Sequence, residues 1–384
     1  MKAYLESSDA IAKTVALCRP GVISAYPITP QTHIVEGLAS MVADGELNAE
    51  FVNVESEHSA ASCCLGASAA GVRSYTSTSS QGLLYMAEVI FNIAGVRLPV
   101  VLTCANRAIS APINIWNDHQ DSITVRDSGW IQLYAETLQE AIDLHIQGYR
   151  LAEDKRVLLP VMVCVDGYIL THGYEIADIP SQELVDKFIP PLELEHKLDV
   201  NNPLSLGVLV GPDYYMETRY ALQKTLEDCL KIIPDISTEF SKTFGRKSGG
   251  LIEGYCLEDA EKVIVAMGSV VGTIKETVDD LRDKGEKVGI LKIITYRPFP
   301  AEDIHMALKD KKEIAVLEKA ISLGSFGPLY TELKSLFQGR KETPKISGFV
   351  IGLGGRDITK NSVQTVFQKL SGKQTDCEFI DLKL

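Results

Sequence analysis

The stretch FVNVESEHSAASCCLGASAAGVRSYTSTSSQGL, residues Phe51–Leu83, contains two strand-like segments separated by a helix-like one. Phe51–Ser56 and Val72–Thr78 are short runs enriched in Val, Tyr and Thr, a composition typical of β-strands. Glu57–Ala70, which lies between them, is rich in Ala and opens with an acidic residue, as helices often do. The order strand, helix, strand predicts a βαβ unit with parallel strands.

The same alternation continues on both sides of this stretch. Further strand-like runs and helix-like stretches follow one another along the first half of the chain, namely the strands Gly21–Tyr26, Pro99–Ala105 and Pro160–Asp166 and the helices Thr32–Ala43, Gln81–Ala94 and Leu138–Ala152. Nearly continuous apolar runs are typical of strands that are buried on both faces. The first half therefore predicts an α/β domain whose parallel sheet is covered on both sides.

The alternation stops near Thr171 and resumes near Gly250. Between these points Asp213–Lys231 is expected to be a helix and Ser237–Gly250 a linker, because the latter contains mostly small and charged residues. The later strands are expected at Lys262–Met267, Lys287–Ile293, Glu313–Glu318 and Ser347–Gly352, with an apolar helical stripe at Val271, Ile274, Val278 and Leu281. We therefore expect a second α/β domain at 250–384, after a first domain with its connecting segment at 1–245.

Length and charge agree with two domains and exclude several kinds of partner. The chain has 384 residues, and 38 Lys and Arg against 51 Asp and Glu give a formal net charge of −13. At about 100–200 residues per domain, this length favours two domains. Binding of nucleic acid or of a membrane surface needs clustered basic residues, so neither partner is expected. No apolar run approaches the ~18 residues of a membrane span, and no signal peptide is evident, so a cytoplasmic location is expected.

Eight cysteines are scattered along the chain without any C-x-x-C spacing. The one close pair, Cys63 and Cys64, is adjacent, and both thiolates of such a pair can hardly reach one metal ion. Cys104 and Cys164 lie inside strand-like runs, where a free cysteine behaves as a small apolar residue. No iron–sulfur cluster and no metal site are expected in this chain.

In parallel sheets, ligands bind beyond the carboxyl ends of the strands, so the residues that follow each strand are the candidates for function. Thr29, in Tyr26–Pro30, is either a helix cap or a ligand contact. Glu57 is placed for acid–base chemistry, or else it complements a helix dipole. The hydroxyl-rich turn Thr76–Gly82 is either a polar binding surface or a helix cap. Arg107 suits a substrate carboxylate, or else an internal ion pair.

Other segments are less specific. Asn114–Trp130 contains Asp118, His119 and Asp121, but their spacing is poor for a metal site, and a polar loop packed into an interface is expected instead. Gly352–Gly355 follows a strand without matching a dinucleotide-binding fingerprint, and the sequence has neither a P-loop nor a G-x-S-x-G elbow.

Seven motifs occur in a fixed order along the chain, namely YPITPQT, VESEHSA, SSQGLLYM, ANRAISAPINIWNDHQDS, RDSGWIQLYAE, LPVMVCVDGYILTH and GPDYYMETRY. Together they resemble the alpha chains of multi-subunit pyruvate:ferredoxin oxidoreductases, in the 2-oxoacid:ferredoxin oxidoreductase family, over essentially the whole length. The resemblance implies a thiamine diphosphate enzyme that oxidatively decarboxylates a 2-oxoacid, transfers the acyl group to coenzyme A and passes electrons to ferredoxin. It also implies a pyrimidine-type cofactor domain followed by a transketolase C-terminal-like domain.

The resemblance assigns roles to individual residues. Glu57, as the catalytic residue, would meet N1′ of the cofactor's aminopyrimidine, and Pro27 and Ile28 would also contact the cofactor. Thr29 and Arg107 would bind the substrate, with Arg107 on the 2-oxoacid carboxylate.

The resemblance also implies that this chain does not act alone. Thiamine enzymes hold Mg²⁺ and the diphosphate through a G-D-G motif, whereas Val165 precedes Asp166-Gly167 here. The diphosphate, Mg²⁺ and iron–sulfur clusters are therefore expected on partner chains of beta, gamma and delta type. One cation and one hydroxyl suit pyruvate. The alternatives that stay open are 2-oxobutyrate, branched-chain or aryl 2-oxoacids, and a non-catalytic assembly subunit.

Overall fold

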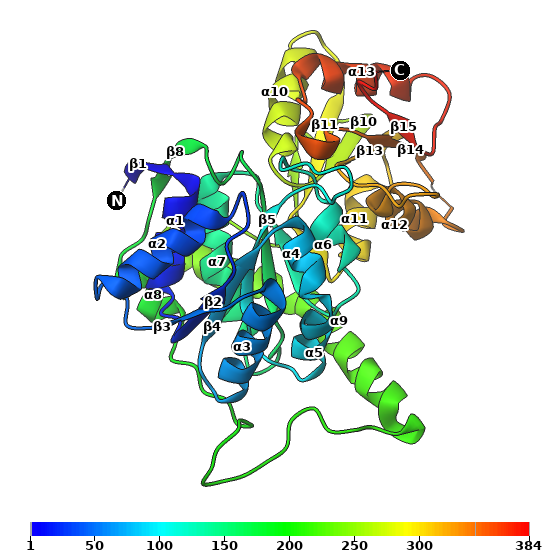
Figure 1. Ribbon diagram of the computed structural model, residues 1–384. Coiled ribbons are helices and arrows are strands. Elements are labelled where there is room, and N and C mark those ends of the chain that lie inside the picture. Colours follow the sequence, from blue (N-terminus) through cyan, green and yellow to red (C-terminus); the bar gives the residue numbers. More distant parts are fainter. Residues whose placement is uncertain (1, 342, 384) are drawn as a thin grey trace.

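The structure is a computed structural model in which residues 2–341 and 343–383 are described. Its first half is built on a seven-stranded sheet with the strand order β12-β6-β7-β5-β4-β2-β3 (Figure 1). All neighbours are parallel except β12, which runs antiparallel to β6. The strands are β2 (Val22–Ala25), β3 (Glu50–Asn53), β4 (Ser74–Thr78), β5 (Val101–Asn106), β6 (Ile131–Tyr134), β7 (Val161–Asp166) and β12 (Thr295–Arg297).

Helices cover both faces of this sheet, as expected for strands that are apolar throughout. Along β5, Val101 and Ala105 belong to the core beneath α1 and α7, whereas Leu102 and Cys104 belong to the core beneath α3 and α5. The helices are α1 (Ser7–Leu17), α2 (Thr32–Ala43), α3 (Glu57–Ala69), α4 (Ser80–Tyr85), α5 (Ala87–Gly95), α6 (Gln120–Thr124) and α7 (Leu138–Ala152). The single helix expected at Gln81–Ala94 is divided into α4 and α5 at Met86, whose ψ of −10° interrupts the regular helix.

The second half contains a six-stranded sheet with the order β15-β14-β13-β10-β11-β9, in which β9 alone is antiparallel to its neighbour. Its strands are β9 (Ile252–Tyr255), β10 (Lys262–Ala266), β11 (Val288–Ile293), β13 (Glu313–Glu318), β14 (Lys345–Val350) and β15 (Glu378–Phe379). Its helices are α10 (Val270–Arg282), α11 (Ala301–Leu308), α12 (Pro328–Phe337) and α13 (Lys360–Leu370). The expected stripe on α10 is buried against this sheet and α13. The α/β class is confirmed in both halves.

The two sheets are joined by shared structure. After β11, the chain enters the first sheet as β12, and one apolar core contains residues of both halves, including Leu83 of α4 and Leu329 of α12. A short antiparallel pair, β1 (Lys2–Glu6) with β8 (Tyr174–Asp178), lies beside α1.

The connection between the halves differs from the expected linker. After α8 (Gln182–Phe188), the helix α9 runs from Pro212 to Phe244, beyond the expected end at Lys231. Phe240 is fully buried and stacks on Phe244 with ring centroids 4.3 Å apart, which anchors the last turns of the helix. The prediction that Ser237–Gly250 is a linker is therefore wrong for its first half. The other end of α9 projects away from the body of the molecule (Figure 1).

Within the part of the chain that the structure describes, no helix is both long and apolar enough to cross a membrane.

The topology marks where a ligand would bind in the first sheet. β2 pairs with both β3 and β4, so the chain leaves β2 toward one edge of the sheet and returns to the other side. A crevice forms at such a switch point, outside the carboxyl ends of the strands. The segments that follow β2, β4 and β5 are in contact at this edge, because Arg107 donates to Thr29 O and Ser80 Oγ donates to Ala108 O.

Candidate functional site

Glu57 is a buried carboxylate at the first position of α3. Ser56 caps the helix by accepting a hydrogen bond from Ser59 N at 3.2 Å. The Glu57 side chain is 8% exposed, and among the described residues it has neither a hydrogen bond nor an ion pair. Gly82 of α4 faces it, because a Cβ at Gly82 would lie 2.7 Å from Glu57 Oε1 and would collide with Thr78 Oγ1. The glycine therefore lets α4 approach a carboxylate whose charge is uncompensated within the described chain.

The end of β4 and the residue that follows it add buried hydroxyls near Glu57. The side-chain oxygens of Thr76, Ser77, Thr78 and Ser79 are buried and have no hydrogen-bond partner among the residues described. Buried polar groups in native structures are normally satisfied, and leaving one unsatisfied costs about 1–3 kcal/mol. This cluster of orphaned hydroxyls favours a polar binding surface over a helix cap. It also marks the carboxyl end of β4 as the place for a polar ligand.

Arg107, directly after β5, is a buried cation held by main-chain oxygens. Its Nη1 donates to Thr29 O at 2.9 Å, and its Nε donates to Asn114 O at 3.0 Å. No ion pair with Asp or Glu is found for it within the described chain, and Nη2 makes no hydrogen bond there, so the ion-pair interpretation is not supported. Burial lowers the pKa of the guanidinium from its ordinary value, yet an arginine stays charged in proteins. One end of the guanidinium is left for an anionic ligand.

Thr29 lies on the loop after β2, in direct contact with Arg107. The helix α2 begins at Thr32 with Gln31 as its N-cap residue, so the prediction that Thr29 caps this helix is wrong. Gln31 holds the loop against β4, because its Nε2 donates to Tyr26 O at 2.8 Å and to Ser77 O at 3.0 Å. Thr29 is exposed, and its hydroxyl makes no hydrogen bond with any described residue. The sequence correctly anticipated that Thr29 and Arg107 lie together.

Pro27 and Ile28 precede Thr29 on the same loop. Pro27 is exposed and Ile28 is half-buried. No hydrogen bond or ion pair brings either residue to Glu57, so their contact with a cofactor stays a prediction.

Asp121, at the start of α6, connects the parts of the site and was considered from the sequence only as a weak metal ligand. It is fully buried, and its Oδ2 accepts hydrogen bonds from Ser80 N and Arg107 N, both at 2.9 Å. Burial raises its pKa, and these main-chain donors oppose the rise. Asp121 thereby fixes the start of α4, which faces Glu57, relative to the backbone of Arg107. A buried acid between two strand ends is the signal that could have identified it.

The loop Asn114–Trp130 packs against the C-terminal domain, as the interface interpretation expected. His119 N donates to Lys319 O at 2.8 Å, and Gly354 N donates to Asp118 Oδ2 at 3.1 Å. Among the described residues, no group of three or more His, Cys, Asp and Glu side chains is arranged to hold a metal ion.

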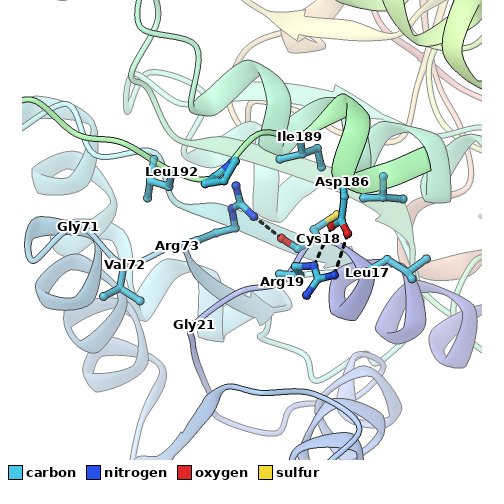
Figure 2. A pocket seen from close by; sticks show the side chains of 12 residues that line it. Leu17, Cys18, Arg19, Gly21, Gly71, Val72, Arg73, Asp186, Ile189 and Leu192 are labelled. Carbon is cyan, nitrogen blue, oxygen red and sulfur yellow. Dashed lines mark hydrogen bonds and ion pairs between the residues drawn. The ribbon is translucent and has the colours of Figure 1, made fainter. Parts of the chain in front are cut away.

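A separate cavity lies at the opposite edge of the first sheet. It measures about 590 Å³ and is lined by residues near the amino ends of β2 and β4, including Gly21 and Arg73 (Figure 2). The Arg73 guanidinium is already committed, because it pairs with Glu153 at 2.5 Å and donates to Cys18 O at 2.7 Å. The four orphaned hydroxyls of Thr76–Ser79 lie toward the other end of β4, which is the candidate site.

Fold and site thus define an α/β protein whose first sheet presents unpaired charged and polar side chains at the carboxyl ends of its strands. Residues 13–238 match the family described as "Pyruvate flavodoxin/ferredoxin oxidoreductase, thiamine diP-bdg", and residues 260–363 match "Pyruvate:ferredoxin oxidoreductase core domain II". The chain belongs to this family of 2-oxoacid oxidoreductases, which confirms the resemblance seen in the sequence motifs.

Relatives at high identity cover almost the entire chain. Pyruvate synthase subunit PorA of Methanothermobacter thermautotrophicus is 51% identical over 99% of this chain and 98% of its own length. The subunit of the same name from Methanosarcina barkeri is 50% identical over 99% of this chain and 96% of its own. Ketoisovalerate oxidoreductase subunit VorA of Pyrococcus abyssi is 42% identical over 96% of this chain and 93% of its own.

Two solved structures share the fold at low identity. The 2-oxoglutarate:ferredoxin oxidoreductase from Magnetococcus marinus has a TM-score of 0.71 at 21% identity, and the match covers 96% of this chain and 65% of that one. A split-gene transketolase, solved as an inactive beta4 tetramer, has a TM-score of 0.55 at 12% identity, covering 96% of this chain and 98% of that one. Both matches show that the fold of this chain, with its two α/β halves, is shared by these proteins.

The residues at the switch point fit a thiamine cofactor. Glu57 presents a carboxylate without a donor among the described residues, Thr76, Ser77, Thr78 and Ser79 present orphaned hydroxyls, and Gly82 lets α4 approach Glu57 closely. An aminopyrimidine ring carries donors and acceptors around its edge, so it could satisfy groups of this kind.

Proposed function

We propose that this chain is the alpha-type subunit of a multi-subunit enzyme that oxidatively decarboxylates pyruvate. The products are acetyl-CoA, carbon dioxide and reduced ferredoxin. The observation that carries the proposal is the pairing, at one switch point, of a buried guanidinium without an acidic partner and a buried carboxylate without a donor. The pyruvate synthase subunits that are about half identical to this chain support the choice of reaction.

Arg107 and Thr29 are proposed to bind the 2-oxoacid. The free end of the Arg107 guanidinium would donate to the substrate carboxylate, and such charge-assisted bonds are about twice as strong as neutral ones. The Thr29 hydroxyl, next to Arg107, would donate to the carboxylate or to the keto oxygen. One cation and one hydroxyl suit a monocarboxylate such as pyruvate.

Glu57 is proposed to hold a proton at N1′ of the aminopyrimidine. When bound, thiamine diphosphate supplies the electron sink that decarboxylation of a 2-oxoacid requires. A largely buried carboxylate that lacks other donors among the described residues is suited to share a proton with a ring nitrogen. Pro27 and Ile28 are proposed to border the cofactor on the loop that carries Thr29.

The diphosphate, its Mg²⁺ and the iron–sulfur clusters are proposed to belong to partner subunits of beta, gamma and delta type. Asp166 is the residue closest to the aspartate of a G-D-G motif, but its carboxylate already accepts from His119 Nε2 and Lys319 Nζ, both at 2.7 Å. An aspartate bound in this way has no oxygen free for a metal. Coenzyme A and ferredoxin are the expected co-substrates of the assembled enzyme.

A second candidate function is the same chemistry on a branched-chain 2-oxoacid. The 42% identity with a ketoisovalerate oxidoreductase subunit favours this candidate over 2-oxobutyrate or aryl 2-oxoacids. The ratio of kcat/KM for pyruvate to that for 2-oxoisovalerate, measured with the purified complex, separates the two. A ratio well above one supports pyruvate, and a ratio below one supports the branched substrate.

The test of the catalytic assignment is a pair of neighbouring variants in the assembled complex. Glu57→Gln should lower pyruvate- and coenzyme-A-dependent reduction of ferredoxin by at least about 100-fold, because positioned acid–base groups contribute about 10²–10⁴-fold. Glu55→Gln, which changes an exposed carboxylate two residues away, should leave the rate within about twofold. Near-normal activity of Glu57→Gln would support a non-catalytic assembly subunit instead.

A further inference from the structure

Arg107 is oriented by two loops, and the C-terminal domain holds one of them. The guanidinium donates from Nη1 to Thr29 O and from Nε to Asn114 O. Since these are its two hydrogen bonds to the described residues, they fix the direction in which the free Nη2 points. A shift of either carbonyl would therefore rotate the group that is proposed to meet the substrate carboxylate.

Asn114 contacts Arg107 through its main chain and the C-terminal domain through its side chain. Asn114 Nδ2 donates to Gly354 O at 3.1 Å, and Asn114 Oδ1 accepts from Trp116 N at 2.8 Å. Trp116 O in turn accepts from Ala108 N at 3.0 Å, directly after Arg107. The amide side chain of Asn114 thus links Gly354, 240 residues away in the sequence, to the loop that orients Arg107.

The segment Gly352–Gly355, here called the brace loop, is shaped to receive this loop. Gly354 and Gly355 have φ values of +61° and +78°, in the left-handed region that favours glycine. A Cβ at Gly354 would lie 2.5 Å from Asn114 Nδ2, and a Cβ at Gly355 would collide with Trp116 Cβ. A second hydrogen bond holds the brace loop to the loop of Asn114, because Gly354 N donates to Asp118 Oδ2. The glycines, which match no nucleotide-binding motif, are explained by this close approach.

We propose that Asn114 is a positioning residue for the 2-oxoacid carboxylate, and that the C-terminal domain sets the affinity for this substrate through the contact between its brace loop and Asn114. The inference rests on the proposed function. It adds a role for the C-terminal domain in substrate binding. Asn114 itself need not touch the substrate, because it acts through its carbonyl on Arg107.

The test uses the assembled complex and two independent variants. Asn114→Ala keeps the main-chain carbonyl but removes the bond to Gly354, and Gly355→Ala places a methyl group against Trp116. Each should raise the apparent KM for pyruvate about five- to ten-fold, with kcat and the KM for coenzyme A within about twofold of the wild type. The matched control is Gly339→Ala in the same domain, because Gly339 has the same φ of +78° but nothing within 4 Å of its Cβ. It should leave both KM values unchanged.

A double-mutant cycle separates positioning from general destabilisation. If Asn114 acts through Arg107, then adding Asn114→Ala to Arg107→Ala should raise the KM for pyruvate no further. An unchanged KM in both single variants would overturn the inference, as would equal rises for pyruvate and coenzyme A or fully additive effects in the cycle. These outcomes leave the proposed function intact, whereas a wild-type complex that turns over no 2-oxoacid would overturn that function.

Discussion

Two buried carboxylates at the same edge of the first sheet differ in how their charge is compensated. Asp166, the last residue of β7, accepts from His119, Lys319 and Ser269 N, so it fastens the C-terminal domain to the sheet. Glu57, which follows β3 at the start of α3, has no donor among the residues described. A saturated carboxylate stabilises the fold, whereas an unsatisfied one is available to a ligand. The contrast separates an acid that holds the fold together from one that we propose to serve function, and both are buried, with exposed fractions of 1% for Asp166 and 8% for Glu57.

The largest expected effect comes from breaking the saturated site. Asp166→Ala leaves Lys319 and His119 buried without their acceptor, and removing one partner of a buried ion pair costs about 3–5 kcal/mol. The free energy of unfolding, measured by urea denaturation followed by circular dichroism, should fall by about that amount. Asp127→Ala, which removes an exposed aspartate near the same loop, should change it by less than about 0.5 kcal/mol. Equal stability of the two variants would contradict the structural role of Asp166.

A smaller effect is expected from the cation Arg107, which has no acidic partner among the described residues. Arg107→Ala should raise the apparent KM for pyruvate about 10- to 100-fold, because hydrogen bonds to charged groups contribute about 1.5–3 kcal/mol. The KM for coenzyme A should change by less than about twofold. Steady-state kinetics of the assembled complex measure both constants. Equal changes for the two substrates would count against a carboxylate-binding role.

The pH dependence of stability sharpens the comparison through a third buried acid, Glu318 at the end of β13. Burial would raise the pKa of Asp166, but the charges of Lys319 and His119 outweigh it and hold that pKa well below its usual range. Glu318 accepts from Leu329 N and Tyr330 N, and burial raises its pKa to about 8. Between its unfolded pKa of about 4.5 and about 8, the folded state therefore binds the extra proton.

Stability should fall as the pH rises through this window, by up to about 1.4 kcal/mol per pH unit. In Glu318→Gln, the contribution of this residue to the slope of the free energy of unfolding against pH should disappear. Urea denaturation of both proteins at pH 5 and pH 8 measures the difference. Parallel pH profiles for the wild type and Glu318→Gln would show that Glu318 is ionised in both states.

Much of the fold and of the candidate site follows from local sequence, and the remainder depends on contacts between residues that lie far apart in the sequence. The strand ends and the apolar stripe of α10 follow from patterns within one or two elements, whereas the family resemblance is what implied that Thr29 and Arg107 act together. The donors to Asp166 could not be foreseen, because His119, Ser269 and Lys319 lie 47, 103 and 153 residues away.

Other features were missed for physical reasons of the same kind. β6 was not among the strands expected from the sequence, and it is stabilised by its place between β7 and β12, which comes from the second half of the chain. The last turns of α9 look polar in sequence, but Phe240 and Phe244 anchor them against Phe188. The hydroxyls of Thr76–Ser79 suited a cap or a binding surface equally well until the structure showed that all four of them lack hydrogen-bond partners among the described residues.

We infer that the Glu57 carboxylate lacks a hydrogen-bond donor in this chain because it serves function and not because it stabilises the fold. The most direct measurement follows one preparation of Glu57→Gln by two readouts, the free energy of unfolding of the chain and ferredoxin reduction by the assembled complex. Removing an uncompensated buried charge should keep the stability or raise it by up to about 1 kcal/mol, while activity falls at least about 100-fold. A variant that keeps its activity, or that loses several kcal/mol of stability as Asp166→Ala should, would contradict the account.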